Sequence, residues 1–180
     1  MTEASDTTAK IGDLQITLAT WLSAVRDAGH PLLDPRIDAA VVALSAATGA
    51  EARALGAALV ALLREGLDDD ASPAAVAAYL DGLLGEGKVG PVTAGDRDSR
   101  TRALRSYQFR TSLPLVARIY DRFPDGTVGP HWVMIERVTD QVSCMDPYPW
   151  DDIDEAIWMP LIEFHVKWEL ADNVCFAWIG

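Results

Sequence analysis

The sequence predicts an α+β protein in which a helical N-terminal part packs on a small antiparallel sheet. Its 14 aromatic residues are distributed unequally, since only Trp21 and Tyr79 precede residue 100. Alanine shows the opposite distribution, with 22 in the first 100 residues and 5 in the last 80. Apolar residues at three- and four-residue steps between alanines are typical of packed helices, and short aromatic or β-branched runs are typical of strands.

The length of 180 residues, of which 49% are hydrophobic, predicts one domain with a large core. We expect a helical subdomain over residues 1–85, a glycine-rich connection over 86–98 and a sheet subdomain over 99–180. Each side alone would have a thin core. The boundary is therefore expected to separate two parts of a single domain.

Four helices are expected in the helical subdomain. The first ends at Gly29, and the second begins at Asp34, an N-cap residue followed by Pro35 at the first helical position. The third ends at Gly66, and the fourth begins at Ser72, which also precedes a proline. The expected buried positions are Ile11, Leu14, Leu18, Trp21, Leu22 and Val25; Ile37, Val41 and Leu44; Leu55, Leu59, Leu62 and Leu63; and Val76, Leu80, Leu83 and Leu84.

The sheet subdomain is expected to consist mostly of strands. An apolar, partly β-branched run over 113–120 predicts the first strand, and the runs 131–138 and 141–146 predict a hairpin. A short helix is expected over 161–168, although its apolar residues fit one helical face only in part. A buried strand over 174–179 is the last expected element.

Charge and cysteine content limit the classes of function. The net charge of −12 repels a phosphate backbone, so we expect no nucleic-acid partner. No apolar run reaches the length of a membrane span and the N-terminus lacks a hydrophobic signal region, so we expect a cytoplasmic protein without a membrane partner. The scattered His30, His131 and His165 and the two cysteines indicate neither a metal site nor a disulfide framework, and no cofactor is expected.

His131 and Asp146 are the first candidates for chemistry, since His131 opens one strand of the expected hairpin and Asp146 ends the next. In a suitable register, the two side chains lie on one face of the sheet. A carboxylate beside an imidazole orients the ring and raises its basicity, which supplies two members of a nucleophile–base–orienter triad. A polar pair at a sheet edge has the same spacing, so the spacing alone leaves both interpretations open.

The residues around this pair resemble a known family. His131 is followed by aromatic and aliphatic residues, and Asp146 is followed by Pro147; a helix with Phe164 and Trp168 and a last strand come next. This order resembles the papain-like cysteine peptidases, and most closely the bacterial family that cleaves double-glycine leaders from bacteriocin precursors. The resemblance covers roughly residues 30–180. It implies a papain-like plan, with the histidine as catalytic base and the aspartate as its orienting carboxylate.

The sequence departs from this family at the nucleophile. The family places a cysteine at the start of a buried helix and a glutamine upstream that holds the oxyanion. The two best equivalents here are Asp34 and Ser72, and the nearest upstream glutamine, Gln15, lies inside the first expected helix. Cys144 and Cys175 lie on expected strands, where we expect them to pack in the core. The resemblance therefore implies a degenerate peptidase, in which the base and its orienter are vestigial.

The function implied by this degenerate resemblance is non-catalytic. We expect a peptidase-like protein that binds a peptide segment or a protein partner in the cleft between its subdomains. Rigid aromatic side chains bind peptides at low entropic cost, and Trp132, Tyr148 and Trp150 are the expected binding residues beside His131. For Trp132, packing in the core is the alternative role, and for the loop with Tyr148 and Trp150 the alternative is a lid that packs on the core of the subdomain.

Two other functions stay open. One is a hydrolase or acyl transferase of the same fold with an unrecognised nucleophile. The other is an acidic inhibitor or immunity-type protein that neutralises a basic effector through its surface charge. A cluster of arginines between the subdomains either bridges internal acids or binds an acidic partner; it consists of Arg97, Arg100, Arg102, Arg105 and Arg110. The sequence does not determine the oligomeric state.

Overall fold

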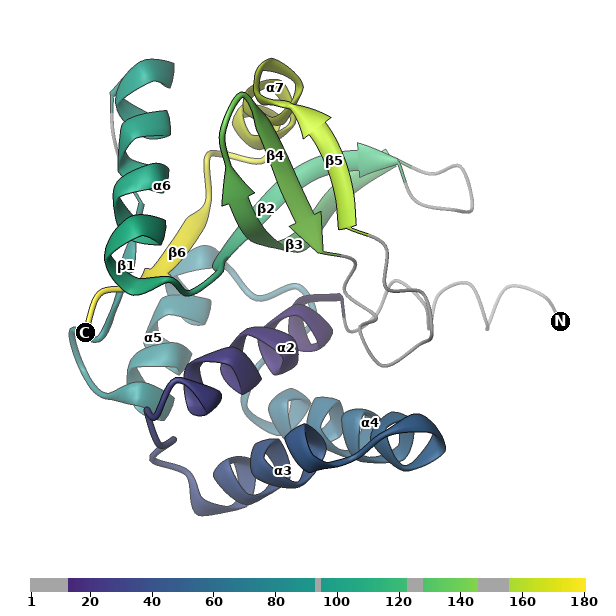
Figure 1. The fold of residues 1–180 in the computed structure, drawn as a ribbon. Helices are drawn as coiled ribbons and strands as arrows, with labels where there is room; N and C mark the ends of the chain where they lie inside the picture. The colour runs from purple at the N-terminus through teal and green to yellow at the C-terminus, as the bar shows by residue number, and fades with distance from the viewer. Residues whose placement is uncertain (1–12, 93–94, 123–127, 146–155) are drawn as a thin grey trace, which may run out of the picture.

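The structure is a computed structural model that describes residues 13–92, 95–122, 128–145 and 156–180. Within these ranges, the chain forms helices α2 to α7 and a six-stranded antiparallel sheet of order β1-β6-β2-β3-β4-β5 (Figure 1). This arrangement confirms the predicted α+β class. In chain order, the elements are α2 Asp13–Asp27, α3 Pro35–Ala46, α4 Gly49–Gly66, α5 Pro73–Leu84, β1 Val89–Pro91, α6 Arg97–Thr111, β2 Leu115–Arg122, β3 Val128–Val138, β4 Gln141–Met145, β5 Ala156–Pro160, α7 Leu161–Leu170 and β6 Cys175–Trp178.

Local chemistry sets the limits of the N-terminal helices, as the sequence predicts. Asp34 caps α3, because its Oδ1 accepts a hydrogen bond from the backbone N–H of Arg36 at 2.9 Å. Ser72 caps α5 by accepting a hydrogen bond from the N–H of Ala75 at 3.1 Å. Gly29 follows α2 with φ of 96°, a left-handed conformation that favours glycine.

The sheet separates two apolar cores, because successive residues of a strand point to opposite faces. On β2, Val116 belongs to the core shared with α2–α5, whereas Leu115 and Ala117 belong to the core shared with α6 and α7. On β3, Trp132 and Val133 are divided in the same way. Figure 1 shows α2–α5 and α7 on opposite sides of the sheet. The helical part therefore packs on one face of the sheet, as expected.

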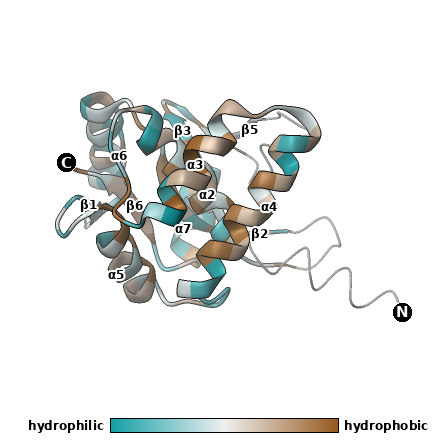
Figure 2. Ribbon diagram, turned by 90° about the horizontal axis from the view of Figure 1, so that it is seen from below, coloured by the Kyte–Doolittle hydropathy of each residue, from teal (hydrophilic) through white to brown (hydrophobic). Residues whose placement is uncertain are grey.

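The sequence does not predict β1, α6 or β5. The expected connection over 86–98 contains β1, in which Gly90 pairs with Ala177 of β6. Helix α6 is mostly hydrophilic, in contrast to α3 and α4 (Figure 2), and within it only Thr101 and Leu104 are buried. An apolar periodicity is therefore absent from this helix, and its position depends on polar contacts with the rest of the fold.

Those polar contacts join α6 to α7. Glu169 receives two hydrogen bonds from Arg97, at 2.7 and 2.8 Å, and one from Arg100 at 2.7 Å. The hydroxyl of Thr101 lies 2.8 Å from Nε2 of His165, and both residues are buried. Two of the clustered arginines therefore bridge an internal acid, which is one of the two roles that the sequence leaves open.

The stability of the α6–α7 contact is expected to depend on pH. Burial, together with Arg100 and Arg97, lowers the pKa of His165 below 6.5, so the unfolded chain binds this proton more readily and stability falls as the pH decreases through 6.5. Glu169 accepts a hydrogen bond from Arg97, and this bond is the main reason that the pKa of Glu169 is lowered from 4.5 to about 2. That carboxylate therefore stabilises the fold fully above pH 4.5, and its contribution is lost as the pH falls toward 2.

Urea unfolding of the wild type and of His165→Gln checks this pH dependence. The glutamine can still bond to Thr101 but cannot titrate, so the variant should lose less stability than the wild type when the pH falls from above to below 6.5. Equal losses in the two proteins would contradict the role assigned to His165.

Candidate functional site

The first two turns of α2 attach to the backbone of β3. Oδ2 of Asp13 accepts a hydrogen bond from the N–H of Trp132 at 2.6 Å, and the Thr17 hydroxyl donates to the carbonyl of Trp132 at 3.0 Å. These contacts lie beyond the described pairing of β3 with β4, which ends where Met134 pairs with Met145. Side chains of α2 therefore form hydrogen bonds with both the backbone N–H and the backbone C=O of Trp132 on β3.

Asp13 also contacts His131, the histidine that the sequence singles out. Oδ2 of Asp13 lies 2.9 Å from Nδ1 of His131. The side chains of Asp13 and His131 are 12% and 20% exposed, so the pair is mostly buried. Asp13 lies in the first described turn of α2, and the first turn of a helix is a position that favours acidic side chains. The imidazole of His131 thus lies against a carboxylate in the first turn of a helix.

The helix that faces His131 is not the one that the family resemblance indicates. We expected the equivalent of the nucleophile at Asp34, before the helix that begins at Pro35. In the structure α3 contacts α2 and α4, and α2 contacts β3 and β2 (Figure 1). Asp34 and Ser72, the two expected equivalents, both cap their own helices. Among the described residues, Asp13 of α2 therefore lies beside His131.

Three other predicted site residues lie outside the described part of the chain: Asp146, Tyr148 and Trp150. Trp132 lies within it, and its side chain is 6% exposed. Its ring stacks with that of Phe176, with 6.4 Å between the ring centroids, and the guanidinium of Arg118 lies 5.8 Å from the Trp132 ring centroid. The structure thus gives the indole of Trp132 a packing role, while its backbone receives the α2 side chains.

Both cysteines are buried in the core, as the sequence predicts. Burial raises the pKa of the Cys144 thiol to about 12, and burial also raises the pKa of Cys175. A thiol is nucleophilic as its thiolate, which burial disfavours here. Cys144 and Cys175 therefore pack the sheet and are unsuited to attack a substrate.

Asp13 is the site residue that the sequence analysis misses. It lies at the start of the first apolar helix. Its carboxylate accepts a hydrogen bond from the N–H of Trp132, which is 119 residues away in the chain. The local pattern shows an acidic residue in the first turn of a helix, which is common because it favours the helix dipole. No local signal indicates that this carboxylate faces His131, because the contact exists only when α2 packs on β3.

The described residues contain no group of three or more histidine, cysteine, aspartate or glutamate side chains placed to hold a metal ion. Among the helices of the described ranges, none is long and apolar enough to cross a membrane.

Comparison with protein-family models, curated protein sequences and solved structures gives no match. Function is therefore inferred from the geometry around Asp13 and His131 and from the residues that resemble the peptidase family.

Proposed function

We propose that this protein is a non-catalytic, peptidase-like protein that binds a peptide segment or a protein partner beside His131, where its helical part meets its sheet. The observation that carries the proposal is the carboxylate of Asp13, which stands at the first residue of α2 and lies 2.9 Å from Nδ1 of His131.

The position of Asp13 supports this proposal, because it is similar to that of the thiol in the family that the sequence resembles. There, a cysteine begins a buried helix, and the helix N-terminus and a strand histidine stabilise its thiolate. Here the same two elements, a helix N-terminus and His131 on a strand, enclose a carboxylate. A carboxylate keeps the negative charge that the surroundings stabilise, so the substitution preserves the electrostatics of the site while it removes the sulfur.

A carboxylate in this position is poorly suited to peptide cleavage. Attack on an amide would form a tetrahedral intermediate that expels the weakly basic carboxylate more readily than the amine, so the amide is regenerated, whereas a more basic thiolate leaves less readily. The same Oδ2 atom also accepts the N–H of Trp132 at 2.6 Å, so attack would require breaking a buried hydrogen bond. The geometry therefore supports binding in preference to catalysis.

The other nucleophiles that the sequence suggests are used elsewhere in the fold. Cys144 and Cys175 are buried in the core shared with α6 and α7. The hydroxyl of Ser72 accepts the N–H of Ala75 at the start of α5. These contacts support the pseudoenzyme over the alternative of a hydrolase or acyl transferase with an unrecognised nucleophile.

Labelling with electrophilic probes tests the absence of catalysis. Wild-type protein should react with neither a fluorophosphonate nor a peptidyl epoxide. In contrast, Asp13→Cys should react with iodoacetamide at about pH 6.5 on the order of ten times faster than Asp13→Cys combined with His131→Ala, because the histidine lowers the pKa of the new thiol. Ser72→Cys is the matched control, since it also places a thiol at a helix start. Wild-type labelling that His131→Ala abolishes would establish an enzyme instead.

Binding is tested on the same proteins with a fluorescein-labelled peptide that ends in two glycines, the motif that the resembling family cleaves. We expect a saturable rise in fluorescence polarisation, with the peptide intact by mass spectrometry, and weaker binding of a peptide that ends in two alanines. Cleavage by the wild type, or equal binding of the two peptides, would contradict the proposal.

A further inference from the structure

A cavity of about 320 Å³ lies at the opposite end of α2 from Asp13. His30, which follows α2, forms one side, and the end of α6 and the segment around Trp178 of β6 form the other. Since α2 has 15 residues, about 20 Å of helix separates this cavity from Asp13. In Figure 1, the C-terminus of the chain lies beside β1 and the lower end of α6, in the same part of the molecule.

Flat rings form the walls of this cavity. The imidazole of His30 stacks on the indole of Trp178, with 4.4 Å between the centroids and 28° between the planes. The guanidinium of Arg110 lies over the ring of Tyr107, 4.9 Å from its centroid. Planar surfaces of this kind bind the faces of aromatic ligands, since offset or stacked rings attract beyond their area of contact.

The cavity also presents hydrogen-bond donors that the protein does not use. Among the described residues, nothing accepts a hydrogen bond from the guanidinium of Arg110 or from Nε1–H of Trp178, and neither group is a buried, unsatisfied atom. Lys88 lies beside the cavity wall, because its Nζ donates to the backbone oxygen of Gly180 at 3.0 Å, but it does not line the cavity itself.

The sign of the charge is unusual for this chain. The net charge is −12, yet none of the described residues that line the cavity is an aspartate or a glutamate. The guanidinium of an arginine presents its donors in a planar fork, which matches a carboxylate. The cavity therefore combines planar apolar walls with donors for an anion.

From these features we infer that the cavity binds an aromatic carboxylate, in which an anionic group is joined to a planar ring. The ring would lie against His30 and Trp178, and the carboxylate would bond to Arg110. A volume of about 320 Å³ is at the lower end of the range for small-molecule sites, so it fits one or two fused rings. The inference goes beyond the proposed function and does not depend on Asp13 or His131.

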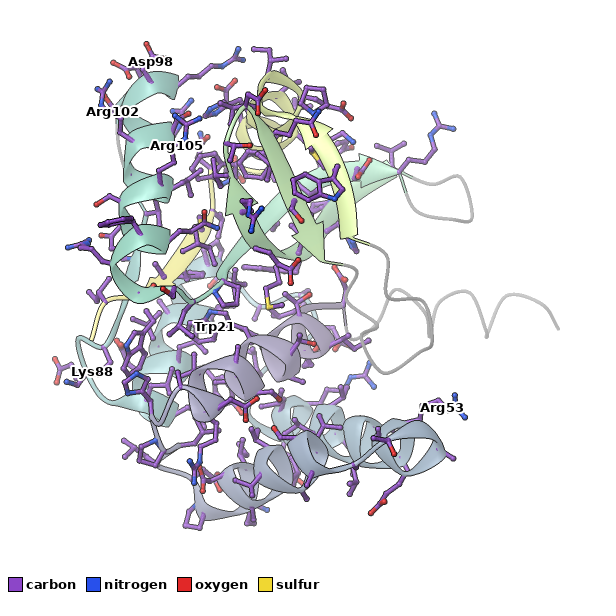
Figure 3. All side chains as sticks on the ribbon, in the orientation of Figure 1. Trp21, Arg53, Lys88, Asp98, Arg102 and Arg105 are labelled. Atoms are coloured by element: carbon purple, nitrogen blue, oxygen red, sulfur yellow. The ribbon has the colours of Figure 1, made fainter. Side chains whose placement is uncertain are left out.

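Calorimetric titration with 2-naphthoate tests this site. We expect saturable binding of one equivalent, and Arg110→Gln should raise Kd at least tenfold. The matched control is Arg102→Gln, which removes an exposed arginine of the same helix that does not line the cavity (Figure 3) and should leave Kd unchanged. Uncharged 2-naphthalenemethanol should bind at least tenfold more weakly than 2-naphthoate. Equal effects of the two substitutions, or equal binding of the two compounds, would overturn the inference.

Two further arms examine the ring stack and the source of the carboxylate. His30→Leu should weaken 2-naphthoate binding while Asp13→Asn leaves it unchanged, which separates this site from the pair at the other end of α2. Acetyl-Gly-Gly-Trp with a free C-terminus should compete with 2-naphthoate if the ligand is a peptide end, and its amide should not. Failure of the free acid to compete would assign the site to small aromatic acids. Absence of any saturable 2-naphthoate binding would refute the site altogether.

Discussion

Replacing Asp13 by alanine is expected to lower the free energy of unfolding by about 2 kcal/mol. The change removes the acceptor for the N–H of Trp132 and leaves that group buried without a partner. It also removes the carboxylate beside His131, whose side chain is 20% exposed. Removing one partner of a buried hydrogen bond costs more than the bond contributes to stability, because the other partner stays desolvated without a replacement.

Urea unfolding followed by circular dichroism measures this effect. Asp27→Ala is the matched control, since Asp27 is the last residue of the same helix and is exposed, and it should change stability by less than about 0.5 kcal/mol. Asp13→Asn keeps the shape of the side chain and an acceptor for Trp132, so its loss should be smaller than that of Asp13→Ala. A loss in Asp13→Ala no larger than in Asp27→Ala would show that the Asp13 contacts do not hold α2 to β3.

Replacing Trp21 by alanine is expected to have the largest effect on stability, about 4 kcal/mol. Trp21 is fully buried between α2 and the sheet (Figure 3), and its Nε1–H donates to the carbonyl of Pro114, just before β2, at 2.9 Å. The change opens a large cavity and also leaves that carbonyl without its donor. Because domains of this size are stable by only about 5–15 kcal/mol, a substantial share of the total would be lost.

Two variants separate the packing and hydrogen-bond contributions of Trp21. Trp21→Phe keeps most of the apolar volume and removes the donor, so we expect a loss of about 1–2 kcal/mol. Trp158→Ala removes an indole that is 52% exposed and should change stability far less. The midpoints and slopes of urea unfolding give the comparison. Similar losses for Trp21→Ala and Trp158→Ala would contradict the packing assigned to α2.

Together, Asp13, Thr17 and Trp21 explain how α2 is held in place. Asp13 and Thr17 bond to the backbone of Trp132, and Trp21 bonds to Pro114. These residues lie at four-residue steps along α2 and therefore on one side of the helix. The same side that packs on the sheet also carries the carboxylate that faces His131, so the site depends on correct docking of α2.

Much of the helical half could be predicted because its signals are local. Asp34 and Ser72 stop the preceding loop and start a helix through hydrogen bonds to residues two or three positions away. The strands of the central hairpin are likewise recognised from alternation and a short turn, and β3 begins at Val128, three residues before the expected start. Such features require no knowledge of the rest of the fold.

Helix α6 could not be predicted in this way. Its charged sequence buries only two of its own residues, so it shows no apolar periodicity that would indicate a helix. The contacts that position it join Arg97 and Arg100 to Glu169, 72 and 69 residues away. A helix held by distant ion pairs leaves little trace in a local pattern, because exposed charged residues are compatible with many conformations.

By itself, the sequence determines the fold class, the helix caps, the burial of both cysteines and the choice of His131 as a residue of interest, because each follows from composition, periodicity or near neighbours. Only the tertiary structure decides which residue His131 faces. Packing of α2 on β3 brings Asp13 to 2.9 Å from its ring, although more than a hundred residues separate the two in the chain. That contact arises from long-range packing of a helix on a sheet, which local sequence patterns do not encode.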